Sequence, residues 1–372
     1  MRQKKPKVAL AHDYLAEYGG AERVLEVLHE IFPDAPLYTA FVDQEKLGDN
    51  WRRFKNWQIY ESWLTKIPFY KKLFSPLRIF APSYFHHFDL SSYDLVISST
   101  NAYFAKAVKV NKTQKHFCYC HTPARSLWGY STMTDWKKNR LTHVVGSLIN
   151  HYLRVVDVKV ARENVGTFIA NSKETQRRIA KFYRLPAKVV YPPINLSLPK
   201  KLTPQAKRTY YLYVNRLALA KHPELAVKVA TQLHLPLKVV GVGKMLPKLK
   251  ETAGETVEFL GFVPDARLRQ LYANAKALLY PVEDEDFGIV PIEAMSFGTP
   301  VVAHASGGPL ETIIDSKNGV LFETLDINSL TQAMKKLDNL KMSPKQIQAS
   351  VSQFADKERF KKEILKVLNL KP

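Results

Sequence analysis

The chain has few cysteines, fewer acidic than basic residues and no long apolar run. Its 372 residues include two cysteines and 34 Asp and Glu against 55 Lys and Arg. The shortage of cysteine excludes a disulfide-rich scaffold, and the lack of an 18-residue apolar window predicts no membrane-spanning helix. Because 46% of the residues are hydrophobic, the chain is also neither collagenous nor disordered. We expect two α/β domains with separate cores.

The two cysteines, Cys118 and Cys120, stand on one predicted strand. Strand alternation puts them on the same face, but i and i+2 neighbours are poor disulfide partners, so we expect free thiols. A metal site with the nearby His116 and His121 is an alternative, although no second ligand pair stands elsewhere at a recognisable spacing. We therefore expect no metal. The N-terminus runs directly into a strand, and we expect a cytoplasmic or peripheral protein.

The positive charge is concentrated in the first half of the chain. Residues 1–200 carry a net charge of +15 of the total of +21. Within them, residues 51–80 combine nine aromatic residues and seven Lys or Arg with a single acid, Glu61. This composition is typical of a segment at an anionic membrane surface, with rings at the headgroup level. A basic face over ordinary core aromatics is an alternative. Nucleic acid is not expected, because no recognition-helix, zinc-finger or RNP pattern is present.

Short apolar strands alternate with helical stretches in the first half. Strands are predicted at Val8–Ala11, Leu95–Ile97, Phe117–Tyr119 and Phe168–Ala170, and a helix at Ala21–Ile31. His12 and Asp13 are expected to interrupt the first strand. Such alternation predicts a parallel sheet with both faces covered by helices.

A second alternating series follows a proline-punctuated linker, Tyr191–Pro193 and Leu198–Lys201. Strands are predicted at Tyr210–Val214, Leu237–Gly241, Val257–Leu260 and Ala277–Tyr280, and helices at Pro223–Leu233 and Arg267–Ala273. We therefore assign residues 1–197 to a first domain and 198–354 to a second. An amphipathic helix is expected at Lys357–Leu368.

The segment after Tyr280 is the most informative part of the sequence. A buried strand ends there, helical apolar spacing covers Ile289–Phe297 and stops at Gly298, and a strand resumes at Val301–Ala303. In a parallel sheet such a loop lies at the carboxyl ends of the strands, where ligands bind. The following helix also presents free N–H groups and a positive dipole end. The candidate backbone donors to phosphate or sugar oxygens are Asp286, Phe287 and Gly288.

The same loop is strongly acidic. Glu283–Asp286 is a run of four acids, which fits a solvated helix N-terminus, and Asp284 with Asp286 resembles a pair of metal-binding carboxylates. Glu293 argues against both interpretations. It falls among apolar residues, where a carboxylate is costly unless it has a hydrogen-bonding partner, and a ribose diol is one such partner.

These residues carry a resemblance to a known family. Glu285 and Glu293 stand eight positions apart around Phe287-Gly288, and the ordered set ends at Gly307-Gly308-x-x-Glu311. The set resembles glycosyltransferase family 4, the retaining nucleotide-sugar transferases of the GT-B fold. The resemblance implies two Rossmann-like doubly wound domains that face each other across a cleft. It also implies that a C-terminal helix, within residues 355–372, completes the first domain.

On the donor side, the resemblance assigns roles to residues of the second domain. Arg216 and Lys221 match the cation pair that binds the donor diphosphate, where a guanidinium and an ammonium can converge. Gly241 and Val263 would border the nucleobase. Glu285 would hold sugar hydroxyls and Glu293 the ribose.

On the acceptor side, two loops of the first domain match the family. Gly19 and Gly20 precede the first helix and would face the donor phosphate, with a plain tight turn as the alternative. His121 follows a strand, and the resemblance implies that it touches the transferred sugar. The string from His121 to Arg125 resembles the mannosyltransferase-like branch of the family.

The implied activity is a retaining, metal-independent hexosyltransferase. It would move mannose, from GDP-mannose as the favoured nucleoside diphosphate sugar, to a lipid-linked or cell-surface glycan acceptor at the cytoplasmic face of a membrane. Arg216, Lys221, Glu285 and His121 are the residues expected to act on the reacting groups, and no cofactor is expected. Two alternatives share the fold. One is a catalytically silent sugar-nucleotide or glycan-binding protein, and the other is a sugar-nucleotide epimerase, which the Glu-x7-Glu loop disfavours.

Overall fold

The computed structural model describes residues 6–74, 76–101, 104–111, 113–131, 140–194, 199, 202–354 and 356–370. The chain forms two compact units. The first comprises Met1–Tyr130, Trp136–Pro193 and Lys357–Pro372, and the second comprises Ser131–Asp135 and Ile194–Asp356. The boundary predicted between residues 197 and 198, and most of the linker predicted at 198–201, lie outside the described residues.

The first unit is built on a parallel sheet with the strand order β3-β2-β1-β4-β5-β6-β7. Its strands are β1 (Val8–His12), β2 (Leu37–Thr39), β3 (Ile59–Glu61), β4 (Leu95–Thr100), β5 (Lys115–Cys120), β6 (Thr167–Ala170) and β7 (Ala187–Val189). The four strands predicted in this half are confirmed. The expectation that His12 interrupts the first strand is wrong, because His12 pairs in register with Ser99 of β4 and Thr39 of β2.

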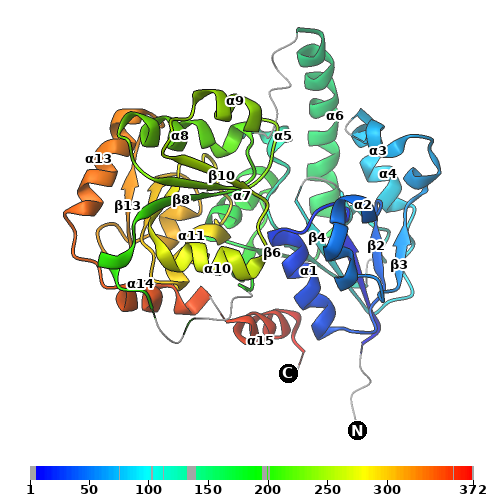
Figure 1. Cartoon of the computed structure of the whole chain (residues 1–372). Helices are drawn as coiled ribbons and strands as arrows, with labels where there is room; N and C mark the ends of the chain where they lie inside the picture. The colour runs from blue at the N-terminus through cyan, green and yellow to red at the C-terminus, as the bar shows by residue number, and fades with distance from the viewer. Residues whose placement is uncertain are drawn as a thin grey trace. The chain divides into compact units, whose positions relative to one another are not determined.

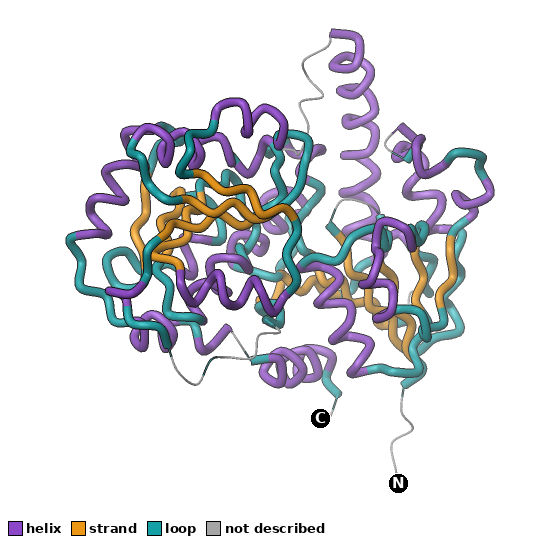
Figure 2. The backbone as a smooth tube through the Cα atoms, viewed as in Figure 1, coloured by secondary structure: helices purple, strands orange, loops and turns teal. Residues whose placement is uncertain are grey.

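Helices cover both faces of this sheet, as the purple and orange layers of Figure 2 show. They are α1 (Gly20–Ile31), α2 (Gln44–Leu47), α3 (Tyr70–Leu73), α4 (Ala81–His86), α5 (Arg125–Trp128), α6 (Arg140–Asn164), α7 (Lys173–Tyr183) and α15 (Lys357–Leu368). Short 3-10 helices complete the unit: η1 (Gly48–Arg53), η2 (Trp63–Lys66), η3 (Pro76–Phe80) and η4 (Ala105–Ala107). The central strands β1, β4, β5 and β6 are buried along most of their length, whereas the edge strands β3 and β7 are half-buried or exposed.

The C-terminal helix α15 packs on the first unit, beside α1 (Figure 1). Its apolar stripe, which includes Phe360 and Ile364, joins the core cluster formed by α1 and the sheet. At the rim, Lys357 Nζ lies 2.6 Å from a carboxylate oxygen of Glu30 on α1. The amphipathic pattern predicted over Lys357–Leu368 is therefore confirmed, with the apolar face buried.

Cys118 and Cys120 are buried free thiols on β5, as predicted. Their side of the sheet also holds a buried ion pair, in which Lys106 Nζ donates to Asp157 Oδ1 at 2.5 Å. The hydroxyl of Tyr183 donates to the other oxygen of Asp157 at 2.8 Å. A buried charge is costly without such partners, so this cluster ties η4, α6 and α7 together.

The second unit contains a parallel sheet with the strand order β10-β9-β8-β11-β12-β13. Its strands are β8 (Tyr210–Val214), β9 (Leu237–Val240), β10 (Val257–Gly261), β11 (Ala275–Tyr280), β12 (Val301–His304) and β13 (Gly319–Phe322). Its helices are α8 (Pro223–Gln232), α9 (Leu246–Thr252), α10 (Asp265–Asn274), α11 (Ile289–Ser296), α12 (Pro309–Thr312), α13 (Ile327–Asp338) and α14 (Pro344–Ser350). The turns are η5 (Gln205–Lys207), η6 (Leu219–Lys221) and η7 (Ser352–Phe354). The predicted elements of this half are confirmed to within two residues at each end.

The aromatic residues of 51–80 divide between the core and the surface. Phe54 is fully buried, and most of the other rings pack partly buried against the two cores of the first unit. Tyr60, Phe69 and Phe80 are exposed. The alternative of ordinary core aromatics therefore holds for most of this segment. In the parts of the chain that the structure describes, no helix is both long and apolar enough to cross a bilayer.

Candidate functional site

Lys221 and Glu285 form a buried ion pair at the carboxyl end of the second sheet. Lys221 ends η6, which follows β8, and Glu285 lies in the loop after the neighbouring strand β11. Lys221 Nζ donates to Glu285 Oε2 at 2.6 Å, and the Tyr280 hydroxyl donates to the same oxygen at 2.8 Å. The two charged side chains are only 10% and 12% exposed. The structure thus brings together two residues that the sequence predicted to act on one donor.

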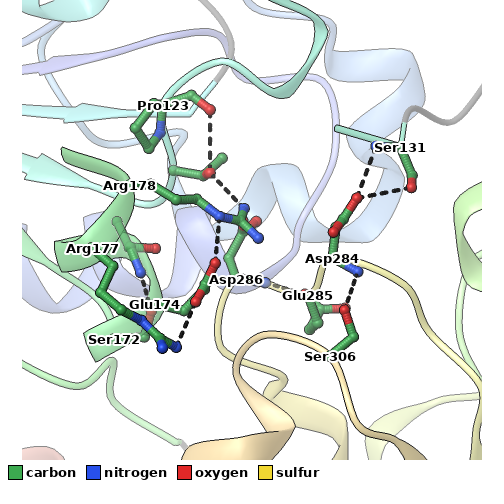
Figure 3. A network of polar contacts seen from close by, with 12 residues as sticks. Pro123, Ser131, Ser172, Glu174, Arg177, Arg178, Asp284, Glu285, Asp286 and Ser306 are labelled. Carbon is green, nitrogen blue, oxygen red and sulfur yellow. Dashed lines mark hydrogen bonds and ion pairs between the residues drawn. The ribbon is translucent and has the colours of Figure 1, made fainter. Parts of the chain in front are cut away.

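The acidic loop of Glu285 rests on two glycines. Gly308 N–H donates to the Glu285 carbonyl oxygen at 2.8 Å. Gly307 has a φ of +65°, and a Cβ built on it would lie 2.0 Å from the same carbonyl oxygen. Only glycine fits there, because the loop backbone occupies the space of a side chain. Next to them, Ser306 Oγ accepts the Asp284 N–H at 3.0 Å (Figure 3).

The three backbone donors predicted in this loop have different surroundings. Asp286 N–H donates to Glu285 Oε1 at 3.3 Å. The Phe287 ring is buried and lies 5.9 Å, centroid to centroid, from Phe354. Gly288 precedes α11 with a φ of +83°, which favours glycine. The loop therefore turns directly into the N-terminus of α11, as predicted.

Glu293 is buried on α11 and has a partner within the protein. The Tyr272 hydroxyl donates to Glu293 Oε2 at 2.9 Å. This partner was not foreseen, because Tyr272 stands on α10 and no sequence pattern connects the two. The hydrogen bond reduces the cost of burying the carboxylate, so a ribose is not the only explanation for Glu293. Its contact with a ribose stays a prediction.

The remaining donor-side candidates lie at the ends of neighbouring strands. Arg216 is exposed just after β8, and its N–H donates to Asn215 Oδ1 at 3.0 Å. Gly241 follows β9 with a φ of +131°, and a Cβ there would lie 1.9 Å from the Asn215 carbonyl oxygen. Val263 follows β10 and is half-buried beside Phe262, which is 76% exposed. These residues share the carboxyl edge with Lys221.

In the first unit, Gly19 and Gly20 begin α1 as predicted. Gly19 N–H donates to Glu22 Oε2 at 2.8 Å, so this amide is engaged by its own helix. His121 follows β5, and its side chain lies at the carboxyl edge beside Ser99, with Ser99 Oγ 2.9 Å from His121 Nε2. Burial, and then the nearby His12, lower the pKa of His121 to about 3. His121 is therefore neutral at ordinary pH.

The loop that carries His121 is braced by α7, which sequence reasoning did not identify. Thr175 Oγ1 donates to the His121 carbonyl oxygen at 3.0 Å, and Arg178 Nη1 donates to Thr122 Oγ1 at 3.2 Å. Arg178 is itself buried and bonded through Nε to Glu174 Oε1 at 2.9 Å (Figure 3). A buried arginine holding a loop by charge-assisted bonds gives the loop one conformation.

The described residues contain no group of three or more His, Cys, Asp or Glu side chains arranged to hold a metal ion. The pair formed by Asp284 and Asp286 is therefore not part of such a group. Asp284 Oδ2 instead accepts the Ser131 N–H at 3.2 Å, within the second unit.

His222, next to Lys221, has a pKa that its surroundings shift. Its Nδ1 lies 3.0 Å from Glu224 Oε1, and its Nε2 lies 3.8 Å from Glu283 Oε2. The hydrogen bond to Glu224, followed by the charges of both glutamates, raises the pKa of His222 above its ordinary value against the effect of burial. The protonated form is therefore favoured in the folded chain.

The raised pKa predicts a stability that depends on pH. The contribution of His222 is fully present below the unfolded value of about 6.5 and is lost as the pH rises through the higher folded pKa. Between pH 6 and pH 9 we expect the free energy of unfolding of the wild type to fall by up to about 1 kcal/mol relative to that of His222→Asn. Asparagine is the replacement because it tolerates the backbone φ of +43° at this position. Urea unfolding at both pH values measures this loss. In a Glu224→Gln background, the pH-dependent loss of stability should be smaller. A difference in unfolding free energy between the wild type and His222→Asn that does not change with pH contradicts the assignment.

Comparison with known proteins shows what this chain is similar to. Residues 196–354 match the model of the family described as "Glycosyl transferases group 1". The α-1,3/1,6-mannosyltransferase alg2 of Schizosaccharomyces pombe is 26% identical, over 85% of this chain and 70% of the relative. The glycogen synthase of Thermus thermophilus is 36% identical, but over only 34% of this chain and 31% of the relative. The ALG2 mannosyltransferase of Kluyveromyces lactis is 27% identical, over 53% of this chain and 47% of its own length.

Solved structures match over nearly the whole chain. HepE of Anabaena, in complex with UDP and glucose, has a TM-score of 0.69 at 20% identity, covering 98% of this chain and 99% of that chain. Sucrose-phosphate synthase from Thermosynechococcus elongatus has a TM-score of 0.72 at 19% identity, with 98% of each chain covered. At this identity the likeness establishes the fold, which is GT-B as predicted. Together with the family match and the curated relatives, it supports a glycosyltransferase enzyme.

Proposed function

We propose that the protein is a retaining, metal-independent glycosyltransferase that moves a hexose from a nucleoside diphosphate sugar to a lipid-linked or cell-surface glycan. Mannose is the favoured sugar, since mannosyltransferases stand among the similar proteins, and GDP-mannose is the favoured donor. The single observation that carries the proposal is the buried pair of Lys221 and Glu285. It sets an ammonium and a carboxylate side by side at the ligand-binding edge of the second sheet.

The two charges have complementary uses. An ammonium has three N–H donors, so Lys221 can keep its bond to Glu285 and still donate to a diphosphate oxygen. Arg216, exposed at the end of β8, supplies a guanidinium that binds phosphate in a bidentate manner. Glu285 Oε1 can accept from sugar hydroxyls while Oε2 is held by Lys221 and Tyr280. Phosphate and sugar recognition are thus coupled through one ion pair.

Glycosyl transfer requires charge to grow on the departing diphosphate while its bond to the anomeric carbon loosens. Fixed cations at Arg216 and Lys221, with the N-terminus of α11, would stabilise that charge without reorganising. Glu285 is bonded to Lys221, which makes it a poor nucleophile for a double displacement. A same-face attack, in which the leaving phosphate helps to deprotonate the acceptor hydroxyl, accounts for retention more economically. The comparisons favour neither a silent binding protein nor an epimerase.

Replacing the donor-side cations should reduce turnover. We expect Arg216→Ala to lower kcat by about two to three orders of magnitude, as loss of one charge-stabilising group does. Lys221→Ala should do the same, and it should also lower stability because it leaves Glu285 buried with an uncompensated charge. Release of nucleoside diphosphate in the presence of acceptor measures the rate. Lys250→Ala, an exposed lysine on α9, is the control, and wild-type turnover in both site variants would refute the assignment.

The donor is identified by its effect on thermal stability. A ligand that binds only the folded chain stabilises it by about 2.7 kcal/mol at one hundred times its Kd. We expect GDP and GDP-mannose to raise the Tm by several degrees, and UDP, ADP and their sugars to raise it less. A shift with UDP alone would reassign the base, and no shift with any nucleotide would contradict the donor site.

The membrane contact is proposed for one surface of the first unit. We define this lipid-facing surface by Phe69, Leu73 and Phe80 around α3, all exposed, with Phe69 at 76%. Exposed lysines accompany these residues, which suits the anionic cytoplasmic leaflet.

Removing lysines from this surface should weaken lipid binding. Lys66→Ala/Lys72→Ala should lower partitioning onto vesicles of anionic phospholipid by about 30-fold at low salt, because each lysine contributes about 1 kcal/mol. Co-sedimentation with anionic and with zwitterionic vesicles measures it, and Lys248→Ala/Lys250→Ala on α9 is the matched control. Equal binding by both double variants opposes the assignment, as does tight, steeply salt-dependent binding to an oligonucleotide.

A further inference from the structure

Four buried polar side chains form a continuous chain at the carboxyl edge of the first sheet. His12 Nε2 lies 3.4 Å from Glu22 Oε1, and His12 Nδ1 lies 3.1 Å from Ser99 Oγ. Ser99 Oγ in turn lies 2.9 Å from His121 Nε2. All four are less than 9% exposed, although none is apolar. They come from the ends of β1, β4 and β5 and the first turn of α1.

The direction of the hydrogen bonds is set at the Glu22 end. A carboxylate only accepts, and Oε2 already accepts the Gly19 N–H at 2.8 Å. The Oε1 contact therefore requires the hydrogen of His12 to be on Nε2. When His12 is neutral, its Nδ1 carries no hydrogen and must accept, so the Ser99 hydroxyl donates to it.

The hydroxyl then decides the state of His121. Because its one hydrogen points to His12, Ser99 Oγ can only accept from His121, which must carry its hydrogen on Nε2. His121 is neutral, so its Nδ1 is bare. Among the described residues, no hydrogen-bond partner reaches Nδ1, and His121 retains 8% exposure. We propose that Glu22, His12 and Ser99 are positioning residues that hold His121 in the Nε2–H tautomer, so that it presents Nδ1 as an acceptor to the transferred sugar.

This inference rests on the proposed function, and on the contact between His121 and the transferred sugar that the family resemblance implies. Without a hydrogen of its own, His121 Nδ1 can accept a hydrogen bond from a hydroxyl. It forms no hydrogen bond with a group that has no hydrogen to donate. His121 would therefore select a sugar with a hydroxyl at the contacted position over a deoxy sugar, which leaves Nδ1 unpaired. It would reject a uronic acid more strongly, because a carboxylate there sets two acceptors against each other. The preference for a hydroxyl-bearing sugar would originate in the Glu22 carboxylate, which is three hydrogen bonds away from His121.

The tautomer can be observed directly in the complete protein without any ligand. Nitrogen-15 NMR at pH 8 distinguishes bare from protonated imidazole nitrogens, and the His121 signals are those lost in His121→Gln. We expect Nε2–H and a bare Nδ1 in the wild type. Glu22→Gln should reverse the chain, because the glutamine oxygen stays on Gly19 N–H while its amide donates to His12 Nε2. His121 should then carry its hydrogen on Nδ1.

The same variants provide a kinetic readout. Glu22→Gln should lower kcat/KM for the hydroxyl-bearing donor about 10-fold, as expected for one mispaired hydrogen bond, with the change mainly in KM. Glu26→Gln, the same chemical change one turn further along α1, should leave the His121 tautomer unchanged. A wild-type His121 with hydrogen on Nδ1, or a tautomer that is the same in Glu22→Gln, overturns the proposal. If the wild-type protein has the expected tautomer but transfers no sugar from any donor, the proposed function fails while the tautomer assignment stands.

Discussion

The donor side of this protein depends on one buried ion pair between residues that are 64 positions apart. Lys221 and Glu285 meet because β8 and β11 are neighbours in a parallel sheet, so the segments that follow them leave the same edge. Neither charge could be buried alone at acceptable cost. The pair holds the acidic loop against η6, and Gly307 and Gly308 support that loop from behind. The same ion pair thus serves the proposed donor chemistry and stabilises the local fold.

The first unit uses buried polar groups in a different way. At the carboxyl edge of its sheet, buried hydrogen-bonding side chains link β1, β4 and β5 to the start of α1. Buried polar groups require partners, so such a chain tolerates few arrangements and gives each member a defined role as donor or acceptor. Arg178 and Thr175 then hold the loop of His121 from the side of α7. His121 is thus held in a defined position, and its Nδ1 is the nitrogen that remains without a hydrogen bond among the described residues.

Much of the fold was predictable from the sequence, but the pairing of side chains was less so. Strands and helices of the second unit were found because their apolar periodicity is strong and glycines mark their ends. Glu285 and Lys221 were identified as a site, yet nothing in the spacing indicated that they bond to each other. Tyr272 was missed as the partner of Glu293, because a contact between two helices leaves no local pattern. The sequence did not tell which aromatic residues of 51–80 are buried, since composition does not distinguish a buried ring from an exposed one.

The sequence by itself determined the class of the fold, the alternation that builds two parallel sheets, the free state of the two cysteines and the ordered motif that points to glycosyl transfer. These follow from local periodicity, turn residues and chemical type, which are properties of short segments. Only the tertiary structure decided which charges neutralise each other, which aromatic rings are buried and which nitrogen of His121 is bonded. Those outcomes depend on residues far apart in the chain that the sheet order brings within hydrogen-bonding distance.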